Sequence, residues 1–408
     1  MLTIVNMEMI YLDNAATTRV DDAVALAVNE VFLESYGNAS SLHDVGQEAK
    51  RHLEGSREKI AAYFGCEPKE ITFTSGGTES NNLAIRGLAK ANPEKKHIVT
   101  SVIEHPCVLD TCKDLESEGY EVDYLKVDEQ GIVSLDEVRE KVRDDTLVVS
   151  VMHVNNEIGT LQPVEEIGII CRKKGVYFHT DNVQGFLKED LALASIDLMS
   201  ISGHKVQAPK GVGILYIRNG VKIKPILTGG GQENNLRSGT ENVPGAVGLA
   251  AAIDVDFKID EVRYSRDKII EGLMKISGTR INGSLTHRVY NNINVSFYGI
   301  EGEALMLMLN EMGIFVSTGS ACASTKLKES YVLKALDVDE MYIHGSIRLS
   351  LGVDVIGKED YIVGKVSEAV EKLREMSPFK LPLEELGVGG SELGEGKIKG
   401  VAREVEDE

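Results

Sequence analysis

This sequence of 408 residues lacks several features that mark other classes of protein. No run of apolar residues approaches the roughly 20 that a membrane-spanning helix needs, which argues against a membrane protein. Positive charge is also scarce, because 44 lysines and arginines face 64 aspartates and glutamates and leave a net charge of −20. Such an acidic chain is a poor partner for nucleic acid or an anionic membrane surface, and we expect it to bind neither directly.

The N-terminus has no basic start and carries acidic residues early, so it does not resemble a secretory signal peptide. Met7 and Met9 are alternatives to Met1 as the first residue. We therefore expect a cytoplasmic protein.

Cysteine is sparse and follows no recognisable pattern. An odd number at irregular spacing, with no CxxC pair, indicates neither a disulfide framework nor a zinc site, so we expect no metal of the protein's own. Cys322 stands apart, because its surroundings, "VSTGSACAST", hold almost no apolar anchor and are typical of a mobile loop. The other four have neighbours typical of small core residues; they are Cys66, Cys107, Cys112 and Cys171.

The composition, with 42% hydrophobic and 26% charged residues, is ordinary, but the chain is too long for one ordinary core and predicts two domains. Between residues 70 and 220, strand-like runs alternate with helix-like runs. This alternation predicts an α/β fold with a mostly parallel seven-stranded sheet, whose ligands bind outside the carboxyl ends of the strands. The seven strand-like segments are 70–75, 96–105, 121–127, 146–154, 176–181, 198–202 and 212–217.

Residues 256–376 follow a different pattern and predict a smaller α+β domain. Helix-like runs cover 259–276, 301–311 and 358–376, and strand-like runs cover 291–299, 314–317 and 346–352. We assign 14–255 to a large ligand-binding domain and 1–13 with 256–378 to the small domain. Residues 379–408 are glycine-rich and acidic, and we expect them to form a disordered tail.

Two strand ends carry residues that could hold a phosphorylated cofactor. In "ITFTSGGTESNNLA", Gly77 and Thr78 precede a helix-like run, where backbone N–H groups and the helix dipole favour an anion. No Walker motif is present, and a plain N-cap would explain the same residues. Lys205 ends the apolar run of "LMSISGHK". Its amine either reaches solvent past a turn or lies in a dry pocket, where it can form a Schiff base.

Other strand ends carry polar side chains whose roles the residues alone leave open. Asp181 could cap a helix or pair with a protonated pyridine nitrogen, and Gln184 could donate to a hydroxyl on the same ring. Asn155 could form an Asx-turn or bind the ligand, and His105 could be a core histidine or stack on a flat cofactor.

Taken together, these groups match the needs of pyridoxal 5'-phosphate. Lys205 would carry it as a Schiff base, and Ser202 and His204 would reach its phosphate.

The motifs in their order along the chain resemble those of the cysteine desulfurases, in the IscS/NifS-like, iron–sulfur assembly branch of the class V aminotransferase superfamily. The resemblance covers about residues 9–378 and implies the fold type I of pyridoxal-phosphate-dependent transferases. It also implies conversion of L-cysteine to L-alanine, with the sulfur kept as a persulfide on Cys322. The motifs are "YLDNAATT", "YGNASSLH", "FTSGGTESNNLA", "EHPCVLDTC", "HVNNEIG", "SGHK", "GGGQENNLRSGT", "STGSACAS" and "SIRLSLG".

The resemblance assigns roles to individual residues. His105 would stack on the cofactor ring and share the catalytic work with Lys205 and Cys322. Thr240 would reach the cofactor phosphate of a neighbouring subunit, which implies a homodimer. The substrate carboxylate would lie between Asn38 and Arg348. The remaining cofactor ligands implied are Gly77, Thr78, Asn155, Asp181, Gln184, Ser202 and His204.

The resemblance further implies an iron–sulfur scaffold protein as partner, with other sulfur acceptors such as the enzymes of tRNA thiolation. Cys322 is then a candidate ligand of a cluster shared with the scaffold. Two alternatives stay open, namely an enzyme like selenocysteine lyase and a dimeric platform of low activity that lends Cys322 to a scaffold.

Four positions depart from the usual pattern of the family and imply an atypical cofactor pocket. Asn182 replaces a small residue after the ring aspartate. Gln207 and Ala208 replace an aromatic residue and a glycine after the lysine, and Ala39 replaces a proline.

Overall fold

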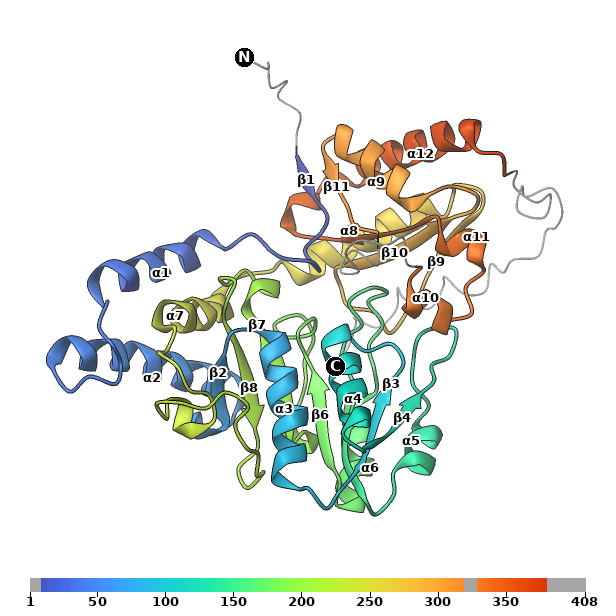
Figure 1. Ribbon diagram of the computed structural model, residues 1–408. Coiled ribbons are helices and arrows are strands. Elements are labelled where there is room, and N and C mark those ends of the chain that lie inside the picture. Colours follow the sequence, from blue (N-terminus) through green and yellow to red (C-terminus); the bar gives the residue numbers. More distant parts are fainter. Residues whose placement is uncertain (1–8, 319–328, 380–408) are drawn as a thin grey trace, which may run out of the picture.

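The computed structural model describes residues 9–318 and 329–379. Figure 1 shows a large part built around one sheet and a smaller part that packs above the upper ends of its strands. Among the described residues, no helix combines the length and the apolar content that crossing a membrane would require.

The large sheet has seven strands in the order β2-β8-β7-β6-β5-β3-β4. Only β8 runs against its neighbours β2 and β7, while β7, β6, β5, β3 and β4 pair in parallel. The predicted α/β class with a mostly parallel sheet is therefore confirmed. The strands are β2 (Ile71–Thr74), β3 (His97–Ser101), β4 (Glu121–Leu125), β5 (Thr146–Ser150), β6 (Tyr177–Asp181), β7 (Leu198–Ser202) and β8 (Gly213–Ile217).

Helices cover both faces of this sheet, which is why its central strands are apolar and buried along their length. Consecutive residues of β7 show this, because Leu198 packs into the cluster under α3 (Gly77–Ala91) and α4 (Pro106–Ser117), whereas Met199 joins the cluster on the other face. Helices α5 (Leu135–Lys141) and α6 (Val164–Lys174) contribute Val138 and Ile167 to that second cluster.

Residues 14–69, for which no element was predicted, form two helices. Helix α1 (Asp22–Glu34) and helix α2 (Asp44–Phe64) both pack against α7 (Val243–Ala251), and Figure 1 shows the three helices together at one end of the molecule. The α1 segment carries large apolar side chains that remain exposed, so its amphipathic pattern is hard to recognise in the sequence.

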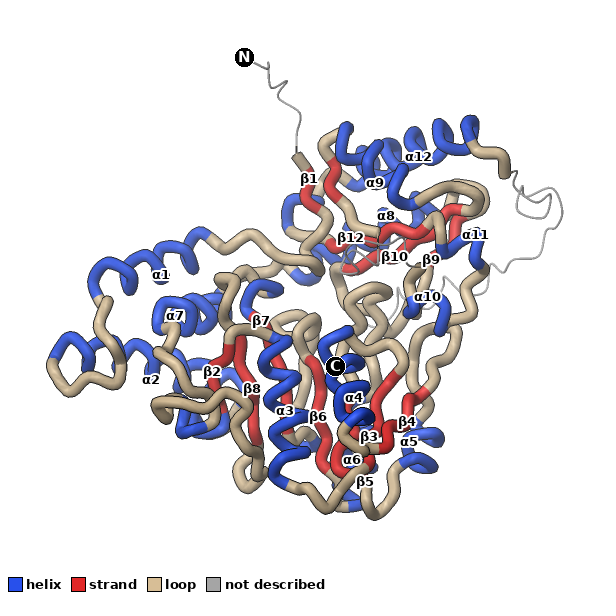
Figure 2. Tube along the Cα trace, in the orientation of Figure 1, coloured by secondary structure: helices blue, strands red, loops and turns tan. Residues whose placement is uncertain are grey.

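The smaller part, as Figure 2 shows, combines short strands with helices around its own core, which includes Ile10, Leu305 and Ile347. Strands β12, β10 and β9 form an antiparallel sheet, and β1 pairs in parallel with β11. Its elements are β1 (Ile10–Tyr11), α8 (Ile259–Leu273), β9 (Thr279–Ile281), β10 (Asn292–Phe297), α9 (Gly302–Glu311), β11 (Ile314–Phe315), α10 (Tyr331–Ala335), α11 (Glu340–Ile343), β12 (Ser346–Ser350) and α12 (Glu359–Met376). The exact domain boundaries stay a prediction, and the tail beyond residue 379 lies outside the described residues.

Candidate active site

The carboxyl ends of β6 and β7 and the start of α3 surround a cavity of about 260 Å³. Parallel strands bring these ends to one edge of the sheet, and Arg348 reaches the same cavity from β12 in the smaller part. A second, more polar cavity of about 370 Å³ adjoins it and shares Ser202 and His204. The residues predicted for the site that line the first cavity are Gly77, Thr78, His105, Asp181, Gln184, Ser202, His204, Lys205 and Arg348.

The start of α3 is shaped to accept a compact anion. Gly76 has φ 151°, a backbone conformation that side chains disfavour, and a Cβ on Gly77 would lie 2.7 Å from Cγ2 of Val183. The absence of side chains therefore lets free N–H groups of the first helical turn face the second cavity, which Ser202 and Lys210 also line. This arrangement fits a phosphate group.

Asp181 lies at the end of β6 and is buried. Its Oδ1 accepts a hydrogen bond from the backbone N–H of Val183 at 2.9 Å, and its Oδ2 accepts one from Nδ2 of Asn81 at 2.6 Å. Burial is the main reason why the pKa of this carboxyl is raised, so a cationic partner in the cavity would stabilise its charged form. A protonated ring nitrogen is a partner of that kind.

His105 is the N-cap of α4, where its Nδ1 accepts a hydrogen bond from the backbone N–H of Cys107 at 3.2 Å. That bond leaves the Nε2 edge of the ring to carry a proton. Burial is the main cause of a lowered pKa for this imidazole, which favours the neutral ring. Cys107 lines the cavity too, but burial raises the pKa of its thiol to about 12, so it is a poor nucleophile.

Lys205 follows β7 in a short 3₁₀ turn, Gly203–Lys205. Its Nζ donates hydrogen bonds to the backbone carbonyls of Ala15 at 2.6 Å and Ala16 at 2.7 Å. Gln184 donates from Nε2 to the same Ala15 carbonyl at 2.9 Å. These two carbonyls hold the amine inside the cavity.

Arg348 is 4% exposed and is held at two of its nitrogens. Nη1 donates to the carbonyl of Asn156 at 2.8 Å, and Nη2 donates to Oδ1 of Asp13 at 2.9 Å. Its Nε is buried without an acceptor among the described residues. A buried guanidinium with an unused donor beside a cavity is suited to a carboxylate ligand.

The structure does not bring every predicted residue to the cavity. Asn155 is buried behind it, where its Oδ1 accepts from the backbone N–H groups of Glu157 and Ile158, which is the Asx-turn alternative. Asn38 and Thr240 are exposed and line neither cavity. Cys322 lies outside the described residues.

The departures from the family pattern leave the cavity intact. Asn182 is buried but points away from the cavity, because its Oδ1 lies 2.8 Å from Nδ1 of His153. Gln207 adopts φ 60°, and its backbone N–H donates to Oγ1 of Thr18 at 2.8 Å. This bond helps to fasten the N-terminal loop, including the Lys205 acceptors, over the turn, while Ala208 is fully buried under it.

Several residues that were not predicted lie at the site or next to it. Asn81 lies one turn after Thr78 on α3, a spacing that would have indicated it. Lys188 is 5% exposed and donates to Oε1 of Gln184 at 3.2 Å, and burial lowers the pKa of its amine to about 7. No pattern in the sequence indicates that this lysine is buried. The Ala15 and Ala16 carbonyls could not be predicted either, because any residue type supplies a backbone acceptor.

The residues present therefore fit the expected cofactor. The phosphate would lie at the start of α3, the ring nitrogen would face Asp181, and the aldehyde carbon would meet Lys205. The buried Oδ1 of Asn81, which has no donor among the described residues, is a further polar group left for a ligand.

Comparisons with known proteins agree with this geometry. The profile of the family "Aminotransferase class-V" matches residues 10–359. The chain is 51% identical over 379 residues to the cysteine desulfurase IscS of Methanosarcina thermophila, an alignment that covers 91% of this chain and 94% of that protein. Its structure is similar to that of a NifS-like protein, with a TM-score of 0.84, 41% identity and coverage of 90% of this chain and 100% of that chain. It is also similar to SspA in complex with cysteine, with a TM-score of 0.77, 37% identity and coverage of 84% and 98%.

Proposed function

The chain belongs to the class V aminotransferase family, and from this premise we infer that it is a cysteine desulfurase dependent on pyridoxal phosphate. The observation that carries the inference is the cavity that brings Lys205, Asp181 and Arg348 together. An amine, a buried carboxylate and a guanidinium are what an amino acid substrate and this cofactor require.

When bound, pyridoxal phosphate supplies an electron sink for bond cleavage next to the substrate amine. Asp181 would keep the ring nitrogen protonated, because the hydrogen bond from Asn81 favours the charged carboxylate and a cationic ring would offset the cost of burying it. Lys205 would first hold the cofactor and then, once displaced by the substrate, take a proton at Nζ. The Ala15 and Ala16 carbonyls would orient that nitrogen without neutralising it as a carboxylate would.

Arg348 would bind the carboxylate of L-cysteine through the donor that is still unused. Its two occupied nitrogens are fastened to Asp13 and to the carbonyl of Asn156, so the guanidinium is oriented before the substrate arrives. Asn38, predicted as the second carboxylate ligand, is exposed and lines neither cavity, and we propose that it acts in the site of another subunit.

We place the sulfur transfer on Cys322. Its thiolate would attack the sulfur of L-cysteine, the carbon–sulfur bond would break, and its electron pair would go to the substrate carbon, which takes a proton. The products are L-alanine and a persulfide on Cys322, which would pass sulfur to an acceptor. A scaffold protein of iron–sulfur assembly is the acceptor we propose first, with the enzymes of tRNA thiolation as further acceptors.

We also propose a homodimer. Large apolar side chains remain exposed along α1 and the loop after it, among them Leu26 at 71%, Phe32 at 63% and Leu42 at 94%. A face of this kind indicates a protein partner. Thr240 is exposed as well, which agrees with a role in a neighbouring site. A cytoplasmic location stays a prediction.

The test is the reaction of the purified, cofactor-loaded protein with L-cysteine, following visible absorbance, alanine and sulfide together. The wild-type protein should be yellow and release alanine. Cys322→Ser should keep the colour, because other residues hold the cofactor, but it should form no persulfide and release no alanine.

If Cys322→Ser releases alanine at near the wild-type rate, Cys322 is not the nucleophile. A colourless wild-type protein that does not take up the cofactor would contradict the whole proposal. Comparing release of sulfide from L-cysteine with release of selenide from L-selenocysteine separates a desulfurase from an enzyme like selenocysteine lyase.

A further inference from the structure

The loop 229–242 contains three consecutive non-glycine residues in a left-handed backbone conformation. Glu233, Asn234 and Asn235 have φ of 47°, 55° and 64°. Most residues with a side chain disfavour this conformation, so contacts elsewhere in the fold must hold the segment in place.

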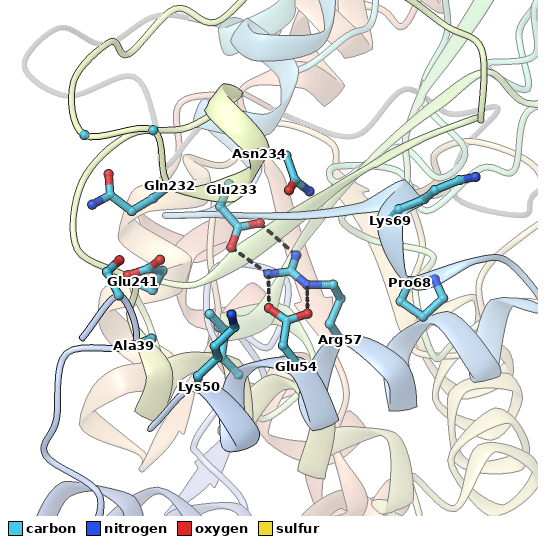
Figure 3. A pocket seen from close by; sticks show the side chains of 14 residues that line it. Ala39, Lys50, Glu54, Arg57, Pro68, Lys69, Gln232, Glu233, Asn234 and Glu241 are labelled. Atoms are coloured by element: carbon cyan, nitrogen blue, oxygen red, sulfur yellow. Dashed lines mark hydrogen bonds and ion pairs between the residues drawn. The ribbon is translucent and has the colours of Figure 1, made fainter. Parts of the chain in front are cut away.

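The contact that holds the segment is a buried ion pair, shown in Figure 3. The carboxylate of Glu233 accepts hydrogen bonds from Nη1 and Nη2 of Arg57, both at 2.8 Å, and from the backbone N–H of Phe73 at 2.9 Å. Arg57 lies on α2 and also donates to the carbonyl of Ile71 at 2.7 Å. The strained segment is therefore clamped to both α2 and β2.

Beyond this clamp, the same loop is fastened to the phosphate end of the active site at two points. Nε of Arg237 donates to Oε1 of Glu79 at 2.8 Å, and Oε2 of Glu79 accepts from the backbone N–H of Ser75 at 2.8 Å. Farther along, Nδ2 of Asn242 donates to the carbonyl of Gly211 at 3.1 Å. Glu79, Ser75 and Gly211 all line the second cavity.

The loop also fixes its own tip. Oε1 of Gln232, the residue before the strained segment, accepts a hydrogen bond from the backbone N–H of Gly239 at 2.8 Å. The positions of Arg237 and of the exposed tip at Gly239 and Thr240 thus depend on how residues 232–235 are held.

We propose that Arg57 and Glu233 are a positioning pair, which holds the loop 229–242 so that Arg237 and Asn242 keep the phosphate end of the site in shape. Neither residue of the pair touches the cavity next to Lys205. The proposal rests on the proposed function, because the ligand of that end is the phosphate of pyridoxal phosphate. The pair should therefore matter for a ligand that has the phosphate and not for one that lacks it.

The test compares two ligands, pyridoxal 5'-phosphate and pyridoxal, on the full-length protein freed of cofactor. Equilibrium dialysis gives the affinity for each ligand. The ratio of the affinity for pyridoxal 5'-phosphate to the affinity for pyridoxal reports the contribution of the phosphate end. In Glu233→Gln the ratio should fall about tenfold, the size of effect that loss of a ligand-orienting neighbour typically has. Affinity for pyridoxal itself should change little.

Arg237→Gln tests the same connection where the side chain is partly exposed and the risk to folding is small. It should lower the ratio in the same direction, and it decides the question if Glu233→Gln does not fold. Glu54→Gln is the matched control, because Glu54 pairs with Arg57 from the outer side at 3.0 Å and contacts neither cavity. This control should leave the ratio unchanged.

Asn234 offers a test of the backbone conformation itself. Its side chain is exposed, so Asn234→Gly and Asn234→Ala remove the same contacts but differ in their tolerance of a positive φ. The alanine variant should have the lower ratio of affinities.

A ratio that stays at the wild-type value in both Glu233→Gln and Arg237→Gln would overturn the inference, even if melting temperatures fall, because the pair would then serve stability alone. A wild-type protein that binds neither ligand would instead contradict the proposed function. The two failures are therefore distinguishable.

Discussion

Two buried arginines in different parts of the molecule show how a structural site differs from a reactive one. Arg57, in the cavity of Figure 3, donates to Glu54, to Glu233 twice and to the Ile71 carbonyl, so every nitrogen has an acceptor. Arg348, beside Lys205, keeps a buried Nε without an acceptor among the described residues. The arginine of the first cavity is thus fully bonded, although Oε2 of Glu241 in the same cavity is buried without a partner among the described residues, whereas the arginine of the second cavity keeps an unused donor.

The difference has a physical cause. A buried donor without an acceptor lowers the free energy of unfolding by about 1–3 kcal/mol. Such a donor is therefore typical of a place where a ligand supplies the acceptor. The region around Lys205 has one donor without an acceptor, Arg348 Nε, and one acceptor without a donor, Asn81 Oδ1. In the region around Arg57, the arginine and Glu233 bind each other and hold the loop 229–242. Substitutions in the two regions should therefore affect different measurements.

The largest effect is expected from Lys205→Ala. The variant should fold with nearly unchanged thermal stability, because the substitution shortens one side chain that lines a cavity. Alanine release from L-cysteine should fall by several orders of magnitude, together with the visible absorbance of the cofactor linked to lysine. Unchanged absorbance would show that another lysine holds the cofactor.

Arg57→Met, unlike Lys205→Ala, should lower the folding stability strongly. Removing the arginine leaves the Glu233 carboxylate buried and without its cation, which typically costs about 3–5 kcal/mol of folding free energy. Chemical denaturation measures this loss, and Arg348→Met, measured beside it without cofactor or substrate, should lose clearly less. Equal losses in the two variants would remove the distinction between the regions.

Arg348→Lys should act on substrate use. A lysine keeps the charge but not the fork of donors, so one or two charge-assisted hydrogen bonds to the substrate carboxylate are lost. Because each such bond contributes about 1.5–3 kcal/mol, kcat/KM for L-cysteine should fall roughly tenfold to a hundredfold. Cofactor affinity measured by dialysis is the control, and a large loss there would place Arg348 in cofactor binding instead.

The smallest effect, and the only gain, is expected from Lys188→Met in the cofactor-free protein. Burial lowers the pKa of Lys188 to about 7, whereas an unfolded lysine titrates near its ordinary value, so the unfolded state binds more protons between these values. The loss of stability caused by burying this amine is complete below about pH 7, and it disappears as the pH rises toward the ordinary pKa of lysine. The gain in melting temperature should therefore be largest near neutral pH and shrink in alkaline buffer, whereas a gain independent of pH would contradict this origin.

Much of the molecule could be predicted without its structure. The alternation of strand-like and helix-like runs predicted the sheet, and helices α8, α9 and α12 lie within a few residues of the predicted ranges. Helices α1 and α2 were missed, since exposed Phe32 and Leu33 blur the apolar stripe by which α1 would be recognised.

The candidate site was predictable where residue type and position in a strand coincide. Lys205, Asp181 and Ser202 end or follow apolar strands, and the parallel sheet brings such ends together whatever the details of packing. Asn155 follows the same rule, yet its side chain is used by the turn that follows it. Hydrophobic periodicity predicts where a residue lies along an element, but it does not predict which partner its side chain binds.

The sequence by itself determined the fold class, the family and the main reactive groups, because apolar periodicity and the order of motifs are local properties of the chain. Only the tertiary structure decided which polar groups remain unused. Arg57 and Arg348 are the same residue type, and what separates them is the acceptors that β2, the loop at Glu233 and the loop at Asn156 bring from distant segments. Hydrogen-bond saturation depends on those long-range neighbours, and no local pattern encodes it.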